Sequence, residues 1–243
     1  MKVLVRSLTV LAFGALAAIV PAKAGLPGEV IVEPKTGFQV WVPMSWRYGT
    51  FPDLPFTHLA MEAPDAAASG ANCIAAAEEI AITKGATQAQ LNESLKVPVG
   101  RDFWKTQAFQ VFKKLEFESD GTRMHPSGIV IQEAIGGGEV EAGGKTFSRK
   151  MTATLWITPG MTYTLVCSTF SEKFEDYRPI VKEVAESFRT KDTASAISAA
   201  VNPAPGQTAT PVSQMHGSAG FGGAQAEMGR SAVAGKSKIV PQK

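Results

Sequence analysis

Residues 147–170, FSRKMTATLWITPGMTYTLVCSTF, contain the clearest structural signal in the chain. Two runs rich in β-branched and aromatic residues flank Pro159-Gly160, a pattern typical of a β-hairpin. Apolar side chains occur in both alternating sets, with Leu155 and Ile157 in one and Trp156 in the other. Such a strand is typical of the interior of a sheet covered on both faces. We therefore expect this hairpin at the centre of a covered sheet.

Further strands are expected before this hairpin. Residues 112–119 alternate apolar and acidic side chains, as a half-buried strand does, and Asp120-Gly121 is expected to form a turn after them. Residues 128–135 form the next expected strand, which Gly136-Gly137-Gly138 is expected to break. Residues 65–72, rich in small side chains, are expected to form a turn. The complete set of expected strands is 29–33, 38–42, 57–63, 73–80, 112–119, 128–135, 147–158 and 161–170.

Three helices are expected, at residues 87–95, 102–109 and a last segment that ends near Phe188. Thr87 is a suitable N-cap for the first. The last shows apolar residues at helical spacing, namely Tyr177, Val181, Val184 and Phe188. Because proline is costly inside a helix, Pro179 favours a start near Asp176. Strands with few helices predict an α+β fold, an antiparallel sheet flanked by helices in an α/β/α sandwich.

The order of these elements resembles that of the PsbP-like superfamily, which includes PsbP, the Ran-binding Mog proteins and DcrB-type periplasmic proteins. The residues that carry the resemblance are Gly37–Pro43 with Trp46, Tyr163–Cys167, Phe174 and Glu186–Phe188. The resemblance spans about residues 29–189. It implies an antiparallel sheet between helices and a role in binding or assembly. It implies no shared active site, and the long C-terminal segment departs from it.

The two ends of the chain differ in composition from its middle. Residues 1–24 combine a basic start, an uncharged run and small residues at Ala22 and Ala24, which predicts a secretory signal peptide cleaved after Ala24. Residues 191–243 are dominated by small and polar residues, so a disordered tail is expected. The expected organisation is thus one α+β domain at residues 25–190, in a periplasmic or secreted protein without a transmembrane segment after cleavage.

Charge and composition exclude several classes of protein. The whole chain has a formal net charge of +2, whereas residues 25–190 carry 16 basic and 20 acidic side chains, a net charge of −4. This balance gives no reason to expect a nucleic-acid partner. Two cysteines and three histidines are too few for an array of zinc fingers.

Cys73 and Cys167 provide the sharpest chemical signal. In an exported chain, two cysteines in expected strands predict a structural disulfide. It would close a loop of about 95 residues and stabilise the fold by at most roughly 4–5 kcal/mol in the chain-entropy model. Two buried free thiols or one reactive thiol are the alternatives, although no Cys-x-x-Cys motif is present.

A candidate binding surface lies in an aromatic segment of the N-terminal half. It comprises Trp46, Arg47, Tyr48, Phe51 and Phe56. Prolines hold this segment extended, which makes it difficult to bury every ring. Arg47 would suit an anionic partner. Packing of the rings in the core is the favoured alternative, because aromatic side chains are commonly interior.

Other chemistries find little support in the sequence. His58, His125 and His216 are isolated, so no metal site is expected. The glycine clusters lack the ending of a phosphate-binding loop and are expected to form a flexible hairpin, and no cofactor is predicted. Paired glutamates could bring acids together on a sheet, although alternating acids usually form its solvated face; these are Glu78-Glu79, Glu116 with Glu118, and Glu139 with Glu141.

The sequence therefore predicts an exported, non-catalytic binding or accessory protein of the bacterial cell envelope, which takes an envelope protein or a small ligand as partner. Two alternatives remain open. A hydrolase would use clustered carboxylates with a raised pKa on the sheet. A small-molecule carrier would need an apolar cavity of several hundred Å³ between sheet and helix.

Overall fold

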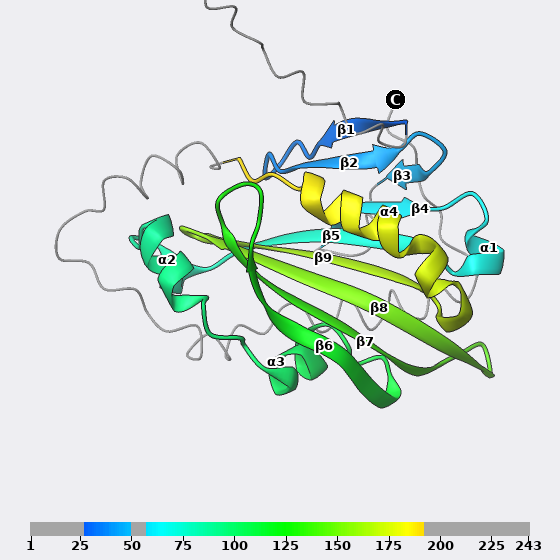
Figure 1. The fold of residues 1–243 in the computed structure, drawn as a ribbon. Helices are drawn as coiled ribbons and strands as arrows, with labels where there is room; N and C mark the ends of the chain where they lie inside the picture. The colour runs from blue at the N-terminus through cyan, green and yellow to red at the C-terminus, as the bar shows by residue number, and fades with distance from the viewer. Residues whose placement is uncertain (1–26, 50–56, 192–243) are drawn as a thin grey trace, which may run out of the picture.

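The computed structural model describes residues 27–49 and 57–191. The expected signal peptide, most of the expected tail, and Phe51 and Phe56 lie outside them. The main sheet has seven antiparallel strands in the order β3-β4-β5-β9-β8-β7-β6, and β1 and β2 form a separate hairpin. The α+β fold predicted from the sequence is confirmed (Figure 1).

The strands are β1 (Gly28–Val32), β2 (Gln39–Pro43), β3 (Arg47–Gly49), β4 (Thr57–Glu62), β5 (Asn72–Glu79), β6 (Lys113–Met124), β7 (Val130–Ala142), β8 (Lys145–Thr158) and β9 (Met161–Phe170). The helices are α1 (Ala66–Ser69), α2 (Gln88–Ser94), α3 (Arg101–Gln107) and α4 (Phe174–Ser187), with short 3-10 turns at Ala81–Thr83 and Ser171–Lys173.

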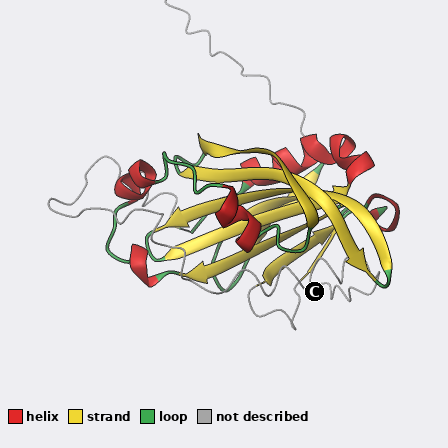
Figure 2. Ribbon diagram, turned by 90° about the horizontal axis from the view of Figure 1, so that it is seen from below, coloured by secondary structure: helices red, strands yellow, loops and turns green. Residues whose placement is uncertain are grey.

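Two hydrophobic cores lie on opposite faces of the sheet, with helices on both sides of the strands (Figure 2). On one face, α4 and the β1–β2 hairpin cover Trp156 and Tyr163. On the other, α2 and α3 cover Leu155 and Ile157. The β8–β9 hairpin is interior in the sheet and buried on both faces, as its two apolar sets predicted.

The glycine run at residues 136–138 does not break a strand, contrary to the expectation from the sequence. All three residues lie inside β7. A Cβ atom on Gly137 would lie 2.7 Å from the carbonyl oxygen of Arg149, and one on Gly138 would lie 2.8 Å from that of Lys113. These glycines therefore allow neighbouring backbones to approach closely. The turn between β7 and β8 lies further along the chain, at Gly143 and Gly144, both with positive φ.

Four further expectations are corrected. Asp120-Gly121 is not a turn but lies within β6, an edge strand, where Asp120 accepts a hydrogen bond of 2.8 Å from Arg101 Nε. The expected turn at 65–72 contains α1, which ends at Gly70 in a left-handed conformation. The aromatic segment, where no strand was expected, contains β3. Helix α4 starts two residues before Asp176, so Pro179 lies inside it rather than in its first turn.

The helix expected at 87–95 is confirmed as α2. The Thr87 side chain accepts a hydrogen bond from the backbone N–H of Gln90, and the Gln90 side chain accepts one from the backbone N–H of Thr87. This reciprocal capping box satisfies two N–H groups at the start of the helix. The expected helix at 102–109 corresponds to α3.

Candidate functional site

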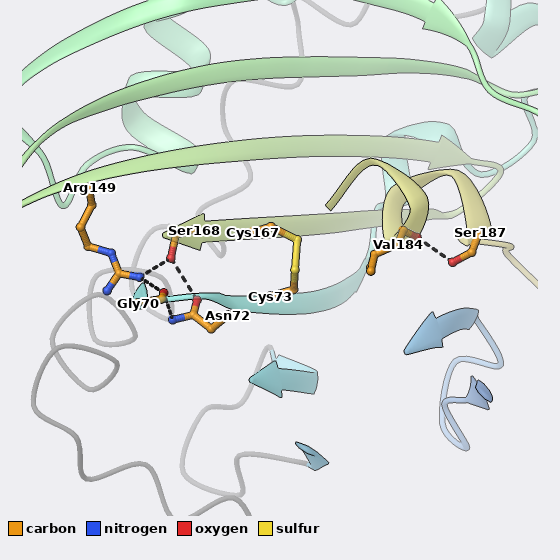
Figure 3. The surroundings of a disulfide bond; sticks show 8 residues. All are labelled: Gly70, Asn72, Cys73, Arg149, Cys167, Ser168, Val184 and Ser187. Carbon is orange, nitrogen blue, oxygen red and sulfur yellow. Dashed lines mark hydrogen bonds between the residues drawn. A yellow bond between two sulfur atoms is a disulfide. The ribbon is translucent and has the colours of Figure 1, made fainter. Parts of the chain in front are cut away.

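Cys73 and Cys167 lie opposite each other on the adjacent strands β5 and β9 and form a disulfide, the pairing expected from the sequence. Both are buried, with 0% and 2% of their surface exposed, in the core beneath α4. Figure 3 shows the bond between the two strands. The bond is thus part of the interior and links strands that are 94 positions apart in sequence.

A polar network lies on the opposite face of these two strands. Successive residues of a strand point to opposite faces, so Asn72 and Ser168 point away from the disulfide core. Arg149 of β8 extends toward them, and its Nη2 donates hydrogen bonds of 2.5 Å to the carbonyl oxygen of Gly70 and 2.7 Å to Ser168 Oγ. Ser168 Oγ in turn donates to Asn72 Oδ1 over 3.0 Å (Figure 3). The network joins β8, β9, β5 and the end of α1.

Arg149 is the unusual member of this network, because its charge is buried. Only 3% of the residue is exposed, and its guanidinium lies 5.5 Å from the centre of the Phe170 ring. Burial lowers the pKa of Arg149 to about 10, so it remains cationic at neutral pH. Among the described residues, no carboxylate forms an ion pair with it.

The sequence contains a signal for Arg149 that the reasoning from sequence missed. Along β8, Arg149 belongs to the same alternating set as Met151, Ala153 and Leu155, all of which are buried. A basic residue in the apolar set of a central strand predicts a buried charge. Its acceptors lie on other elements and cannot be recognised from this pattern.

The structure describes three residues of the candidate binding surface, Trp46, Arg47 and Tyr48, and their side chains differ in burial. Trp46 is buried, with 6% of its surface exposed, and its ring lies 6.2 Å from that of Tyr177 in the core beneath α4. This is the core packing that was the favoured alternative. Tyr48 is half-buried against the same core. Arg47 is exposed and forms an ion pair of 3.1 Å with Glu62.

The carboxylates considered for catalysis are mostly held by cations. Hydrogen bonding to Lys150 lowers the pKa of Glu118, and Arg178 adds to this effect. Glu139 and Glu141 pair with Lys114 and Lys113, at 3.1 Å and 2.5 Å. Burial raises the pKa of Glu78, which has no carboxylate beside it on the same face of β5.

Near these charges the described residues line two hollows. A cleft of about 440 Å³ is lined by residues of both signs, including Glu116, Glu118, Lys114 and Lys150. A smaller one of about 240 Å³ lies between α4 and the sheet, beside Val181 and Ile135. Small-molecule pockets usually measure roughly 300–1,000 Å³, so the smaller hollow falls below the size expected of a carrier.

Neither described histidine is placed to bind a metal. His58 Nδ1 lies 3.6 Å from Glu33 Oε1. His125 is buried, and its two ring nitrogens form hydrogen bonds with Ser127 and Ala185. Within residues 27–49 and 57–191, no group of three or more His, Cys, Asp or Glu side chains could hold a metal ion. In the same ranges no helix is long and apolar enough to cross a membrane.

No protein-family model and no curated protein matches the chain. Among solved structures, CyanoP, the cyanobacterial PsbP of Synechocystis sp. PCC 6803, is 16% identical over 69% of this chain and 95% of its own, with a TM-score of 0.46. LpqN of Mycobacterium tuberculosis, involved in cell envelope biogenesis, is 11% identical over 67% of this chain and 89% of its own, with a TM-score of 0.43. The likeness is one of fold. CyanoP is a PsbP protein, and PsbP belongs to the superfamily whose order of elements this sequence resembles.

Proposed function

We propose that this chain acts outside the cytoplasm as a non-catalytic binding or accessory protein of the bacterial cell envelope. The observation that carries the proposal is the disulfide between Cys73 and Cys167, buried at the centre of the sheet. Disulfides persist in oxidising compartments and are rare where glutathione keeps thiols reduced. The sequence of residues 1–24 supports the same compartment, because it has the features of a cleaved secretory signal.

The ion pairs formed by Glu118, Glu139 and Glu141 support a non-catalytic role. A hydrolase that uses two acids needs one with a raised pKa, to donate a proton, close to another that is ionised. Glu118 instead has a lowered pKa between Lys150 and Arg178, the state suited to an ion pair. Glu139 and Glu141 are likewise paired with lysines.

Export is tested by expressing the full chain in a bacterium and separating periplasm, cytoplasm and membranes. We expect the protein in the periplasm or the medium, with a mass that corresponds to cleavage after Ala24. In denaturant, its two cysteines should resist a thiol-alkylating reagent until dithiothreitol is added. The double variant C73A/C167A is the matched control, since it keeps the signal and lacks the thiols. Cytoplasmic protein with two alkylated thiols would refute the proposal.

A further inference from the structure

We propose that Arg149 anchors a site for an oxyanion, a carboxylate or a phosphate- or sulfate-type group of a bound ligand. This inference rests on the proposed binding role and names the chemistry of the ligand. The site lies on the face of the sheet opposite the disulfide, where β8, β9 and β5 adjoin the end of α1 (Figure 3).

The first argument is the orientation of the guanidinium. Both hydrogen bonds from Arg149 to described residues are made by Nη2, to Gly70 and Ser168, which occupies both protons of that nitrogen. Arginine has five N–H donors. The three on Nε and Nη1 have no hydrogen bond to any part of the chain that the structure describes. The side chain is thus fixed at one nitrogen and retains donors for an acceptor.

The second argument is the missing counter-charge. The same-face neighbours of Arg149 in the sheet are uncharged: Phe147, Met151, Gly138, Phe170 and Ser168. Four other arginines of the described ranges form ion pairs with carboxylates, namely Arg47, Arg101, Arg123 and Arg178. Arg189 donates to the carbonyl oxygens of Glu186 and Phe188, but it is only half-buried. Arg149 combines deep burial with no carboxylate from a described residue.

The third argument concerns what the two observed hydrogen bonds require. A neutral amide has two N–H donors and could supply both of them without a charge. Burial of an unpaired cation is unfavourable, and groups in this position are normally paired. An oxyanion would neutralise the charge and accept hydrogen bonds that are stronger than neutral ones. Among the described residues the positive charge is used only in the contact with the Phe170 ring, 5.5 Å away, and an aromatic ring does not neutralise it.

The test measures the thermal unfolding of the mature chain, residues 25–243, in sodium sulfate, phosphate and acetate against sodium chloride at equal ionic strength. We expect a saturable rise in Tm with at least one oxyanion, of about 3–6 °C at tenfold excess over its Kd. The variant R149Q keeps donors for Gly70 and Ser168 and should lose the rise. R149K, which lacks the planar fork, should retain only part of it.

The matched control is R189Q, which should keep the full rise. A wild-type rise that is unchanged in R149Q, or no rise with any anion, would overturn the proposal. A rise in Tm with sulfate and phosphate but not with acetate would indicate that the ligand carries a phosphate- or sulfate-type group. A rise with acetate alone would indicate that it carries a carboxylate.

The chain has its own carboxylates outside the described ranges, Asp53, Asp192 and Glu227. If the wild type shows no rise but D53N, D192N or E227Q acquires one, the counter-charge is internal and the ligand site is refuted. Because these measurements use purified protein, they are independent of the fractionation that tests export.

Discussion

His125 Nε2 lies 3.1 Å from the carbonyl oxygen of Ala185, a contact that joins the turn between β6 and β7 to helix α4. A carbonyl oxygen only accepts, so Nε2 carries the proton and donates it. Nδ1 accepts from the backbone N–H of Ser127 at 3.1 Å and lies 2.7 Å from its Oγ. Both ring nitrogens are thus satisfied in the neutral ring.

Stability should therefore fall as the pH is lowered from about 6.5 toward 4. Burial lowers the pKa of His125 to about 4, so the unfolded chain takes up the proton first, and the folded state loses roughly 2–3 kcal/mol across this window. Urea unfolding at pH 7 and at pH 5 measures the effect. H125Q should show a smaller loss between these pH values; an equal loss in H125Q would assign the effect to other groups.

The disulfide should contribute substantially to stability. The C73A/C167A variant is expected to unfold at a lower urea concentration, with a loss of about 2–5 kcal/mol, because the long loop between the two strands is no longer closed in the unfolded chain. The wild type measured in dithiothreitol should approach the variant. An unchanged midpoint after complete reduction would contradict this prediction.

Trp46 should act on stability, since it is part of the core beneath α4. Its removal in W46A leaves a cavity against Tyr177 and is expected to cost about 3–5 kcal/mol. The neighbouring substitution R47A removes an exposed ion pair with Glu62 and should cost less than about 1 kcal/mol. Denaturant titrations of the two variants compare them directly. Equal stability of W46A and the wild type would place Trp46 outside the core.

Gly137 should be intolerant of even a methyl group. A Cβ atom there would lie 2.7 Å from the backbone carbonyl oxygen of Arg149, and G137A is expected to cost about 1–3 kcal/mol as the strands move apart. Gly121 in β6 offers a matched control, because no atom lies within 4 Å of a Cβ built on it. If G121A and G137A unfold at the same denaturant concentration, close approach of the backbones is not what requires glycine in β7.

Local patterns predicted much of the fold. The corrected expectations concern features that the pattern of neighbouring residues does not determine. The β8–β9 hairpin and the Thr87 cap depend on neighbouring residues, which the sequence displays. Glycines inside a strand are ambiguous, because a break and a close backbone approach need the same residue. Strand β3 has only three residues, too few to show an alternating pattern. For Gly136–Gly138, the choice between a break and a close backbone approach depends on the position of β6 and β8 beside β7.

The candidate site was less accessible to sequence reasoning. The pairing of Cys73 with Cys167 follows from a count of two cysteines in an exported chain. The partners of Arg149 lie 79 and 19 positions away along the chain, on other elements, and no local pattern connects them. Trp46 had two interpretations, and the packing of α4 against it decides between them.

The covalent link between β5 and β9 also determines how the protein responds to force. A pull on the two ends of the chain reaches Cys73 and Cys167 and passes through their bond. The intervening residues, with α2, α3 and strands β6 to β8, are bypassed by the load. Under oxidising conditions only the segments before Cys73 and after Cys167 can be drawn out, and reduction releases the rest. Single-molecule stretching should therefore give a longer final contour length in dithiothreitol than without it.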